Sequence, residues 1–152
     1  MIFSLHSKEI PSLADLGGKA KALIETTQAG FNVPEGFVLT VDFFRAWESD
    51  IRSTGLWREF LAAPARETCA ALQEQARQMR FTPEMYAAIE PFLVRLPQDA
   101  LYAVRSSSPE EDLARTSFAG QYETILGVRL PELEKGIAEA FSSVLDFRVV
   151  EY

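Results

Sequence analysis

Three stretches of the sequence combine a cation or hydroxyl groups with small residues, a combination that suits phosphate binding. The first is Gly17-Gly18-Lys19. Glycines let backbone N–H groups approach a phosphate closely, the start of a following helix favours negative charge, and lysine adds a mobile positive charge. Because Ala20 follows the lysine and the spacing differs, this is not a Walker A loop. By itself the pattern is weak, and an ordinary helix start with a solvated lysine explains it better.

The second stretch places an arginine and three serines directly after an apolar run. Val104 ends that run, and residues 105–108 read Arg-Ser-Ser-Ser. A guanidinium group can hold phosphate oxygens through two parallel hydrogen bonds, and serine hydroxyls can add donors. An ion pair between Arg105 and the acidic residues at 110–112 would explain the pattern equally well. The residues by themselves support the phosphate-binding interpretation and the ion-pair interpretation equally.

The third stretch is a turn of small residues between polar flanks, where residues 117–124 read Ser-Phe-Ala-Gly-Gln-Tyr-Glu-Thr. Such a turn could fold over the phosphates of a nucleotide, with Gly120 permitting the backbone geometry. A plain hairpin turn explains the same pattern. None of the three stretches is decisive alone.

The elements that position the first stretch are predicted from periodicity and turn residues. Apolar residues at helical spacing predict a helix over 16–29, which Gly30 is expected to end. The apolar run 37–40 predicts a short buried strand. Thr40 is expected to act as the N-cap of a helix that follows it.

The rest of the chain predicts helices in the middle and strands around the other two stretches. Residues 57–96 are helical in pattern, and Pro64 and Pro83 are each expected to start one of these helices. Strands are predicted at 100–104 and within 117–128, and Pro131 is expected to open a last helix. The predicted fold is therefore α+β: a small, mostly antiparallel sheet near Phe37, Leu101 and Thr124, flanked by helices, with a helical insertion outside this core.

Composition narrows the classes of function. The chain has 152 residues, one cysteine (Cys69) and a net charge of −7. That length favours one domain, and the negative charge argues against nucleic acid or an anionic membrane as a partner. A single cysteine excludes an internal disulfide, and no apolar run has the length of a membrane-spanning helix. We expect a cytoplasmic protein.

Taken together, the three stretches resemble the signatures of the pyruvate-phosphate-dikinase and phosphoenolpyruvate-synthase family. The similar segments, in family order, are 16–20, 29–40, 103–108, 111–113, 117–124 and 148–152. The sequences Arg-Ser-Ser and Phe-Ala-Gly-Gln resemble the synthase-like and rifamycin-phosphotransferase-like branches. Ser108-Pro109 and Tyr122 depart from the usual family residues and change only loop detail. The whole chain, 1–152, is thus expected to be the N-terminal part of an ATP-binding domain, the first lobe of an ATP-grasp-type fold, and to be truncated.

The resemblance implies ATP and Mg²⁺ as cofactors. It also implies a relay in which phosphoryl passes from ATP to a histidine on another domain and then to pyruvate. By this resemblance Lys19 would contact the ATP phosphates and Arg105, as the catalytic residue, would clamp the transferring group. Ser106 and Ser107 would shape the loop after Arg105. The loop that covers the phosphates, and a second phosphate-binding arginine, are matched by Gly120, Gln121 and Arg148. Cations on rigid strand ends give phosphoryl transfer the positioning and charge neutralisation that it needs.

Parts of the family's machinery have no match in this chain. No residue matches the acidic magnesium ligands, so the chain is predicted to hold no metal ligand and Mg²⁺ is expected to be held from outside it. His6 matches no phosphorylated-histidine motif and is expected to be a surface or packing residue. The chain alone is therefore expected to be inactive.

Two alternatives to a synthase-like enzyme stay open at this point. One is a stand-alone, non-catalytic module that binds a nucleotide or a partner protein. The other is the ATP-binding part of a rifamycin-phosphotransferase-like enzyme.

Overall fold

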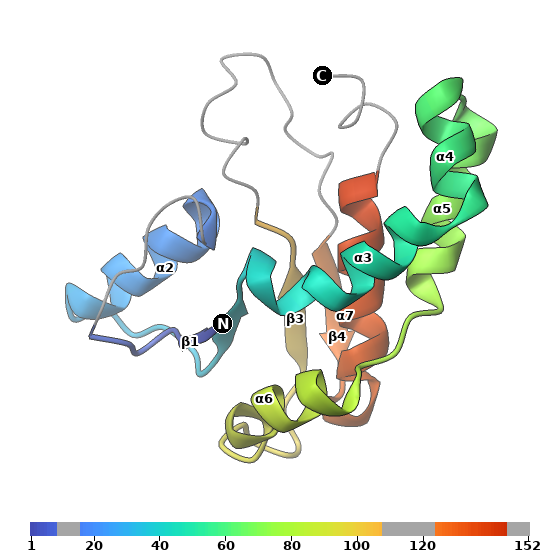
Figure 1. Cartoon of the computed structure of the whole chain (residues 1–152). Coiled ribbons are helices and arrows are strands. Elements are labelled where there is room, and N and C mark those ends of the chain that lie inside the picture. The colour runs from blue at the N-terminus through green and yellow to red at the C-terminus, as the bar shows by residue number, and fades with distance from the viewer. Residues whose placement is uncertain (9–15, 108–123, 146–152) are drawn as a thin grey trace. The chain divides into compact units, whose positions relative to one another are not determined.

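The computed structural model describes residues 1–8, 16–107 and 124–145 (Figure 1). Within these ranges the chain forms six α-helices, α2 to α7, four short β-strands, and 3₁₀-helices at several junctions. The described residues divide into two compact units. The first unit comprises 1–8, 16–44, 83–98 and residue 107. The second comprises 45–82, 99–106 and 124–145.

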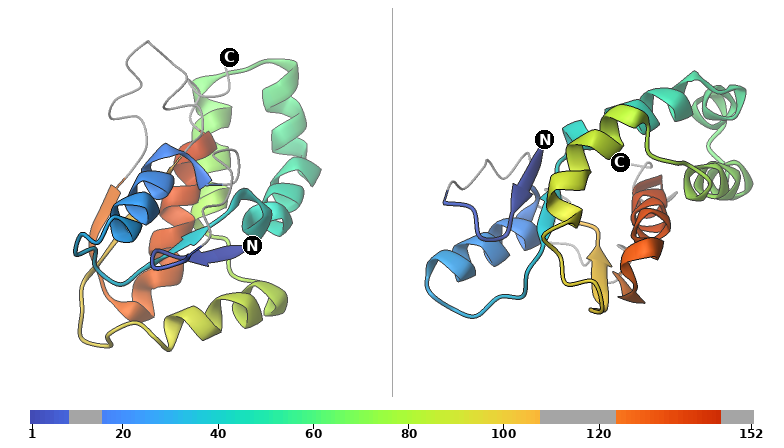
Figure 2. Two further views of the ribbon diagram at one scale, coloured as in Figure 1. Left: turned by 90° about the vertical axis from the view of Figure 1, so that its left-hand side faces the viewer. Right: turned by 90° about the horizontal axis from the view of Figure 1, so that it is seen from below.

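The first unit is built on a two-stranded ladder covered by one helix. Strand β1 (Ile2–Ser4) pairs antiparallel with β2 (Phe37–Leu39), so that Phe3 lies opposite Val38. Helix α2 (Gly18–Gln28) runs alongside this ladder (Figure 2) and buries an apolar face against it. The buried residues of that face and their partners are Leu16, Ala20, Ile24, Phe3, Leu5 and Val38. Burial of this stripe ties α2 to the sheet.

The end of α2 confirms the role predicted for Gly30. Its φ of 85° is left-handed, a region that glycine enters without steric cost. The Gly30 N–H donates to the Thr27 carbonyl and the Phe31 N–H donates to the Thr26 carbonyl. This pair of hydrogen bonds is a Schellman motif, which satisfies the last carbonyls of the helix.

Thr40 has a different role from the predicted N-cap. The element after it begins with the 3₁₀-helix η1 (Val41–Phe44), which leads into α3 (Arg45–Ser53). The Thr40 hydroxyl donates to the Met1 carbonyl at 2.8 Å, and the Thr40 N–H donates to the same oxygen. The Thr40 side chain is thus bonded to the segment beside β1, because the hydrogen bonding between the two strands extends one residue beyond β2, from Thr40 to Met1.

Helix α6 (Pro83–Leu93) completes the described part of the first unit. Its first residue is Pro83, as predicted from the tolerance of proline at the first helical position. The same prediction for Pro64 is wrong, because the helix that follows Pro64 begins at Arg66 with Ala65 as its N-cap residue. The Phe92 ring lies 5.7 Å from the Phe37 ring of β2, centroid to centroid. This aromatic contact joins α6 to the β1–β2 ladder.

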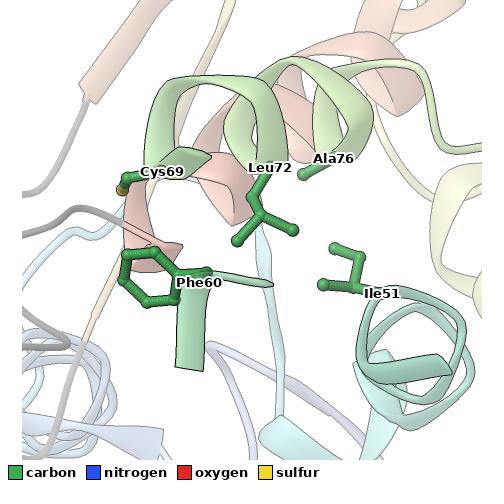
Figure 3. Packing of buried hydrophobic residues seen from close by; sticks show 5 residues of the cluster. All are labelled: Ile51, Phe60, Cys69, Leu72 and Ala76. Carbon is green, nitrogen blue, oxygen red and sulfur yellow. The ribbon is translucent and has the colours of Figure 1, made fainter. Parts of the chain in front are cut away.

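The second unit has a helical core. Helices α3, α4 (Gly55–Ala62) and α5 (Arg66–Arg77) pack with α7 (Leu133–Ser142). Figure 3 shows Ile51, Phe60 and Leu72 converging from α3, α4 and α5, each 1% exposed. Cys69 and Ala76 extend this cluster along α5. Helices α3, α4 and α5 therefore form a buried apolar cluster of their own within the second unit.

The second sheet packs on α7. Strand β3 (Tyr102–Arg105) pairs antiparallel with β4 (Thr124–Val128), and the register shifts between Tyr102 and Val104. A Cβ on Gly136 of α7 would lie 3.3–3.4 Å from methyl groups of Val104 and Val128, so glycine allows the sheet to approach closely. The 3₁₀-helix η3 (Leu130–Glu132) carries the predicted proline and leads directly into α7, while η4 (Ser143–Leu145) follows it.

The fold is α+β, as predicted, with small antiparallel sheets. The described strands form two separate ladders, β1–β2 and β3–β4, where a single sheet was expected. No helix in the described ranges is long and apolar enough to cross a membrane.

Candidate nucleotide-binding site

The first predicted stretch forms the start of α2. Gly17 is the N-cap residue, with φ 72° and ψ 164°, and Lys19 is the second residue of the helix. Ala20 and Ile24 face the core of the first unit, while Lys19 is half-buried. The apolar stripe thus fixes the helix, and the lysine lies in its first turn, where N–H groups and the helix dipole favour an anion.

The structure brings Ser107 from the second stretch to the start of this helix. The Ala20 N–H donates a hydrogen bond to the Ser107 Oγ at 3.3 Å. Gly17 also packs on this serine: a Cβ at Gly17 would lie 2.8 Å from the Ser107 carbonyl carbon and 2.9 Å from its oxygen. It would collide with the Ser107 Oγ as well. Two segments 87 residues apart therefore meet at a buried glycine within one unit.

Arg105 lies at the end of β3, as the sequence predicts. It pairs with Thr124 of β4, and its side chain is exposed. The guanidinium makes no ion pair with another residue of the described ranges, and its proposed acidic partners at 110–112 lie outside those ranges. The strand thus presents a cation at its end, and α7 packs against the strand.

Ser106 and Ser107 belong to different units. Both are half-buried, but Ser106 ends a segment of the second unit and Ser107 belongs to the first. The contacts to Gly17 and Ala20 come from Ser107. The sequence predicts that both serines shape this loop and gives no means of telling them apart.

Three predicted site residues, Gly120, Gln121 and Arg148, lie outside the described residues. His6 lies beside β1, where its Nε2 is 3.5 Å from a Glu35 carboxylate oxygen, with 40% of the side chain exposed. This matches a surface residue that packs locally.

The described ranges contain no group of three or more histidine, cysteine, aspartate or glutamate side chains that could hold a metal ion.

Two groups in the described ranges have clearly shifted pKa values, and neither is a predicted site residue. The pKa of Arg77 in α5 is raised, first because it donates a 2.8 Å hydrogen bond to Glu139 of α7. Burial raises the pKa of the Tyr102 phenol in β3.

Each unit thus carries one predicted cation at the end of an element: Lys19 at the start of α2 in the first unit and Arg105 at the end of β3 in the second. Comparison with known families identifies the chain further. The family described as "Pyruvate phosphate dikinase, AMP/ATP-binding domain" matches residues 13–152. The chain belongs to this family.

Several curated proteins are similar over most of the chain. A rifampicin phosphotransferase of a Streptomyces species is 31% identical over 161 residues, which cover the whole chain and 19% of that protein. A phosphoenolpyruvate synthase of Neisseria meningitidis is 32% identical over 157 residues, or 90% of the chain and 19% of the relative. The Escherichia coli phosphoenolpyruvate synthase is 30% identical over 152 residues, with the same shares. The chain thus spans about a fifth of the length of these relatives.

The structure gives Gly17 a larger role than the sequence analysis assigned to it. The glycine pair indicates a flexible helix start, but the family resemblance assigns no contact to Gly17. Its positive φ and its packing on Ser107 both require glycine. The signal in the sequence is the glycine pair Gly17-Gly18 itself.

Proposed function

We propose that this chain is the ATP-binding part of a phosphotransferase that passes phosphoryl from ATP to a histidine on another domain. Pyruvate is the acceptor that we propose for the final step. The observation that carries the proposal is the packing of Ser107 on Gly17 and Ala20, because it joins the two family signatures at one helix start. Family membership over residues 13–152 supports the ATP-binding part.

The proposed roles follow the chemistry of each side chain. Lys19 contacts the ATP phosphates as a mobile point charge, and Arg105 clamps the transferring group through its planar guanidinium. Ser106 and Ser107 shape the loop that follows Arg105. The loop over the phosphates and a second arginine are assigned to Gly120, Gln121 and Arg148. Mg²⁺, when bound, would neutralise charge on the phosphates, from ligands outside this chain.

Removal of Arg105 tests this function directly. In the full-length protein, Arg105→Ala is expected to lower ATP-dependent self-phosphorylation by roughly a thousandfold, because a clamp on the transferring group acts in the transition state. The measurement is incorporation of ³²P into the protein from labelled ATP. The matched control is Arg58→Ala, since Arg58 is an arginine of α4 to which the family resemblance assigns no role.

The two variants give clear outcomes. Normal labelling of Arg58→Ala with loss of labelling in Arg105→Ala supports the proposal. Near-normal labelling of Arg105→Ala removes this arginine from the mechanism, and absence of labelling in the wild-type protein contradicts the relay itself.

The acceptor has a second candidate. Relatives named rifampicin phosphotransferase match the whole chain at about the same identity as the synthases. A rifamycin is therefore the alternative acceptor. Release of label from the phosphorylated protein on addition of pyruvate, or of rifampicin, distinguishes the two.

A further inference from the structure

Helix α2 begins without a cap of its own. The first N–H groups of a helix have no partner inside it, and a side chain at the N-cap usually accepts one of them. Gly17 has no such side chain, and no cap hydrogen bond comes from this position. The first intrahelical bond runs from the Lys21 N–H to the Gly17 carbonyl at 3.2 Å. The N–H of Ala20 precedes that bond and needs another acceptor.

Ser107 supplies this acceptor from a distant segment. Its Oγ accepts the Ala20 N–H, which is the bond that an N-cap serine would accept from the third helical residue. A serine at position 17 could not make this arrangement, because any Cβ there would collide with Ser107. Glycine at the N-cap and the hydroxyl of Ser107 thus work together as one cap.

We propose that Ser107 is a positioning residue for Lys19. The serine fixes the first turn of α2, which carries Lys19, against the loop that follows β3. This inference rests on the proposed function, since it assumes that Lys19 contacts the phosphates. It gives Ser107 a role that acts through the helix and differs from a direct contact with ATP.

The physical reason is preorganisation. A helix end with an unmet N–H group frays, and a lysine on a frayed turn loses conformational entropy when it binds. Because Ser107 accepts the hydrogen bond of the Ala20 N–H, the first turn of α2 is already ordered before the nucleotide binds. The contact involves one hydrogen bond at the edge of the unit's core, so its loss should affect affinity more than folding.

The test compares three variants of the full-length protein by calorimetric titration with Mg-ATP. Ser107→Ala is expected to raise the Kd about tenfold, the equivalent of one hydrogen bond. Ser107→Thr, which keeps the hydroxyl, is expected to recover most of the affinity. Thr26→Val is the matched control: it removes a hydroxyl of the same helix that bonds to the Ala22 carbonyl. It is expected to bind ATP as the wild type does.

Amide hydrogen exchange at Ala20 in the ligand-free protein tests the contact separately. Faster exchange in Ser107→Ala, with wild-type exchange in Thr26→Val, is the expected result. Unchanged affinity in Ser107→Ala would overturn the inference, and so would unchanged exchange at Ala20. A wild-type protein that does not bind ATP would instead overturn the proposed function, while the exchange data would still show whether Ser107 holds α2.

Discussion

The first turns of helices α2 and α4 both need acceptors for N–H groups that have no partner inside the helix, and the two helices obtain them in different ways. At the start of α4, Thr54 is the N-cap and its hydroxyl accepts the Trp57 N–H at 3.1 Å, three residues along the chain. At the start of α2, the N-cap is Gly17 and the acceptor comes from Ser107. The start of α4 is therefore specified locally. The start of α2 depends on tertiary structure, and this dependence falls where the family signatures meet.

We infer that the difference separates a helix start that is only structural, at α4, from one that we propose positions a ligand-binding residue, at α2. A self-capped helix start is fixed by residues within one turn, so its loss changes stability alone. A helix start that borrows its cap couples two segments, so its loss should also change binding. The following variants test this distinction, beginning with the largest expected effect.

Gly17→Ala is expected to have the largest effect. A side chain at φ 72° costs about 1–2 kcal/mol, and the collision of its Cβ with the Ser107 backbone adds about 1–3 kcal/mol. We expect a loss of roughly 2–5 kcal/mol in the free energy of unfolding, measured by urea denaturation. ATP affinity should fall with it, because the first turn of α2 moves.

Gly30→Ala is the matched control for Gly17→Ala. Gly30 also has positive φ, at 85°, but nothing lies within 4 Å of the position a Cβ would take. Only the backbone cost of about 1–2 kcal/mol is expected, without an effect on ATP binding. Equal losses of stability in the two variants would mean that packing on Ser107 contributes nothing.

Thr54→Ala tests the other side of the comparison. Loss of this N-cap is expected to cost about 1 kcal/mol in the free energy of unfolding, by urea denaturation. ATP affinity should remain that of the wild type, because the cap is local to α4. A fall in ATP affinity similar to that of Ser107→Ala would contradict the distinction between the two helix starts.

The smallest effect concerns pH and lies in the second unit. Burial raises the pKa of Tyr102 above the ordinary value of 10.0, so the folded state keeps a proton that the unfolded state releases. Stability is therefore unaffected by this group well below pH 10 and falls as the pH rises above it. Tyr102→Phe should lessen that fall, measured as Tm between about pH 9 and 11. An identical pH dependence in the variant would show that Tyr102 does not contribute.

Much of the fold follows from local sequence chemistry. Gly30 and Pro83 mark a helix end and a helix start because φ freedom and a missing N–H act within one turn. The strand predicted at 100–104 is observed as β3, one or two residues later. Of the site residues, the sequence places Lys19 at a helix start and Arg105 at a strand end, and the structure agrees.

Strand β4 shows where the local pattern fails. Strict alternation along the strand would place Thr124, Leu126 and Val128 on one face. In the structure Leu126 is 75% exposed, whereas Val128 is buried. The register shift opposite β3 and the positive φ of Gly127 place an extra residue in β4. Such a bulge resets the period of two, and it depends on the partner strand.

The pairing of strands and the hydrogen-bond partners of polar side chains likewise cannot be predicted from the local sequence pattern. The pairing of β2 with β1, and the bond from Thr40 to Met1, depend on which segments meet. Hydrogen-bonding capacity is a property of a side chain, but its partner is chosen by the whole fold.

The sequence by itself therefore determined the short helices and strands, the family signatures and the cations that we propose for ATP binding, because these depend on neighbours within a few positions. The acceptor of the Ala20 N–H and the reason for a glycine at position 17 are visible only in the tertiary structure. Both depend on Ser107, which is 87 residues beyond Ala20 in sequence and within hydrogen-bonding distance of it in space.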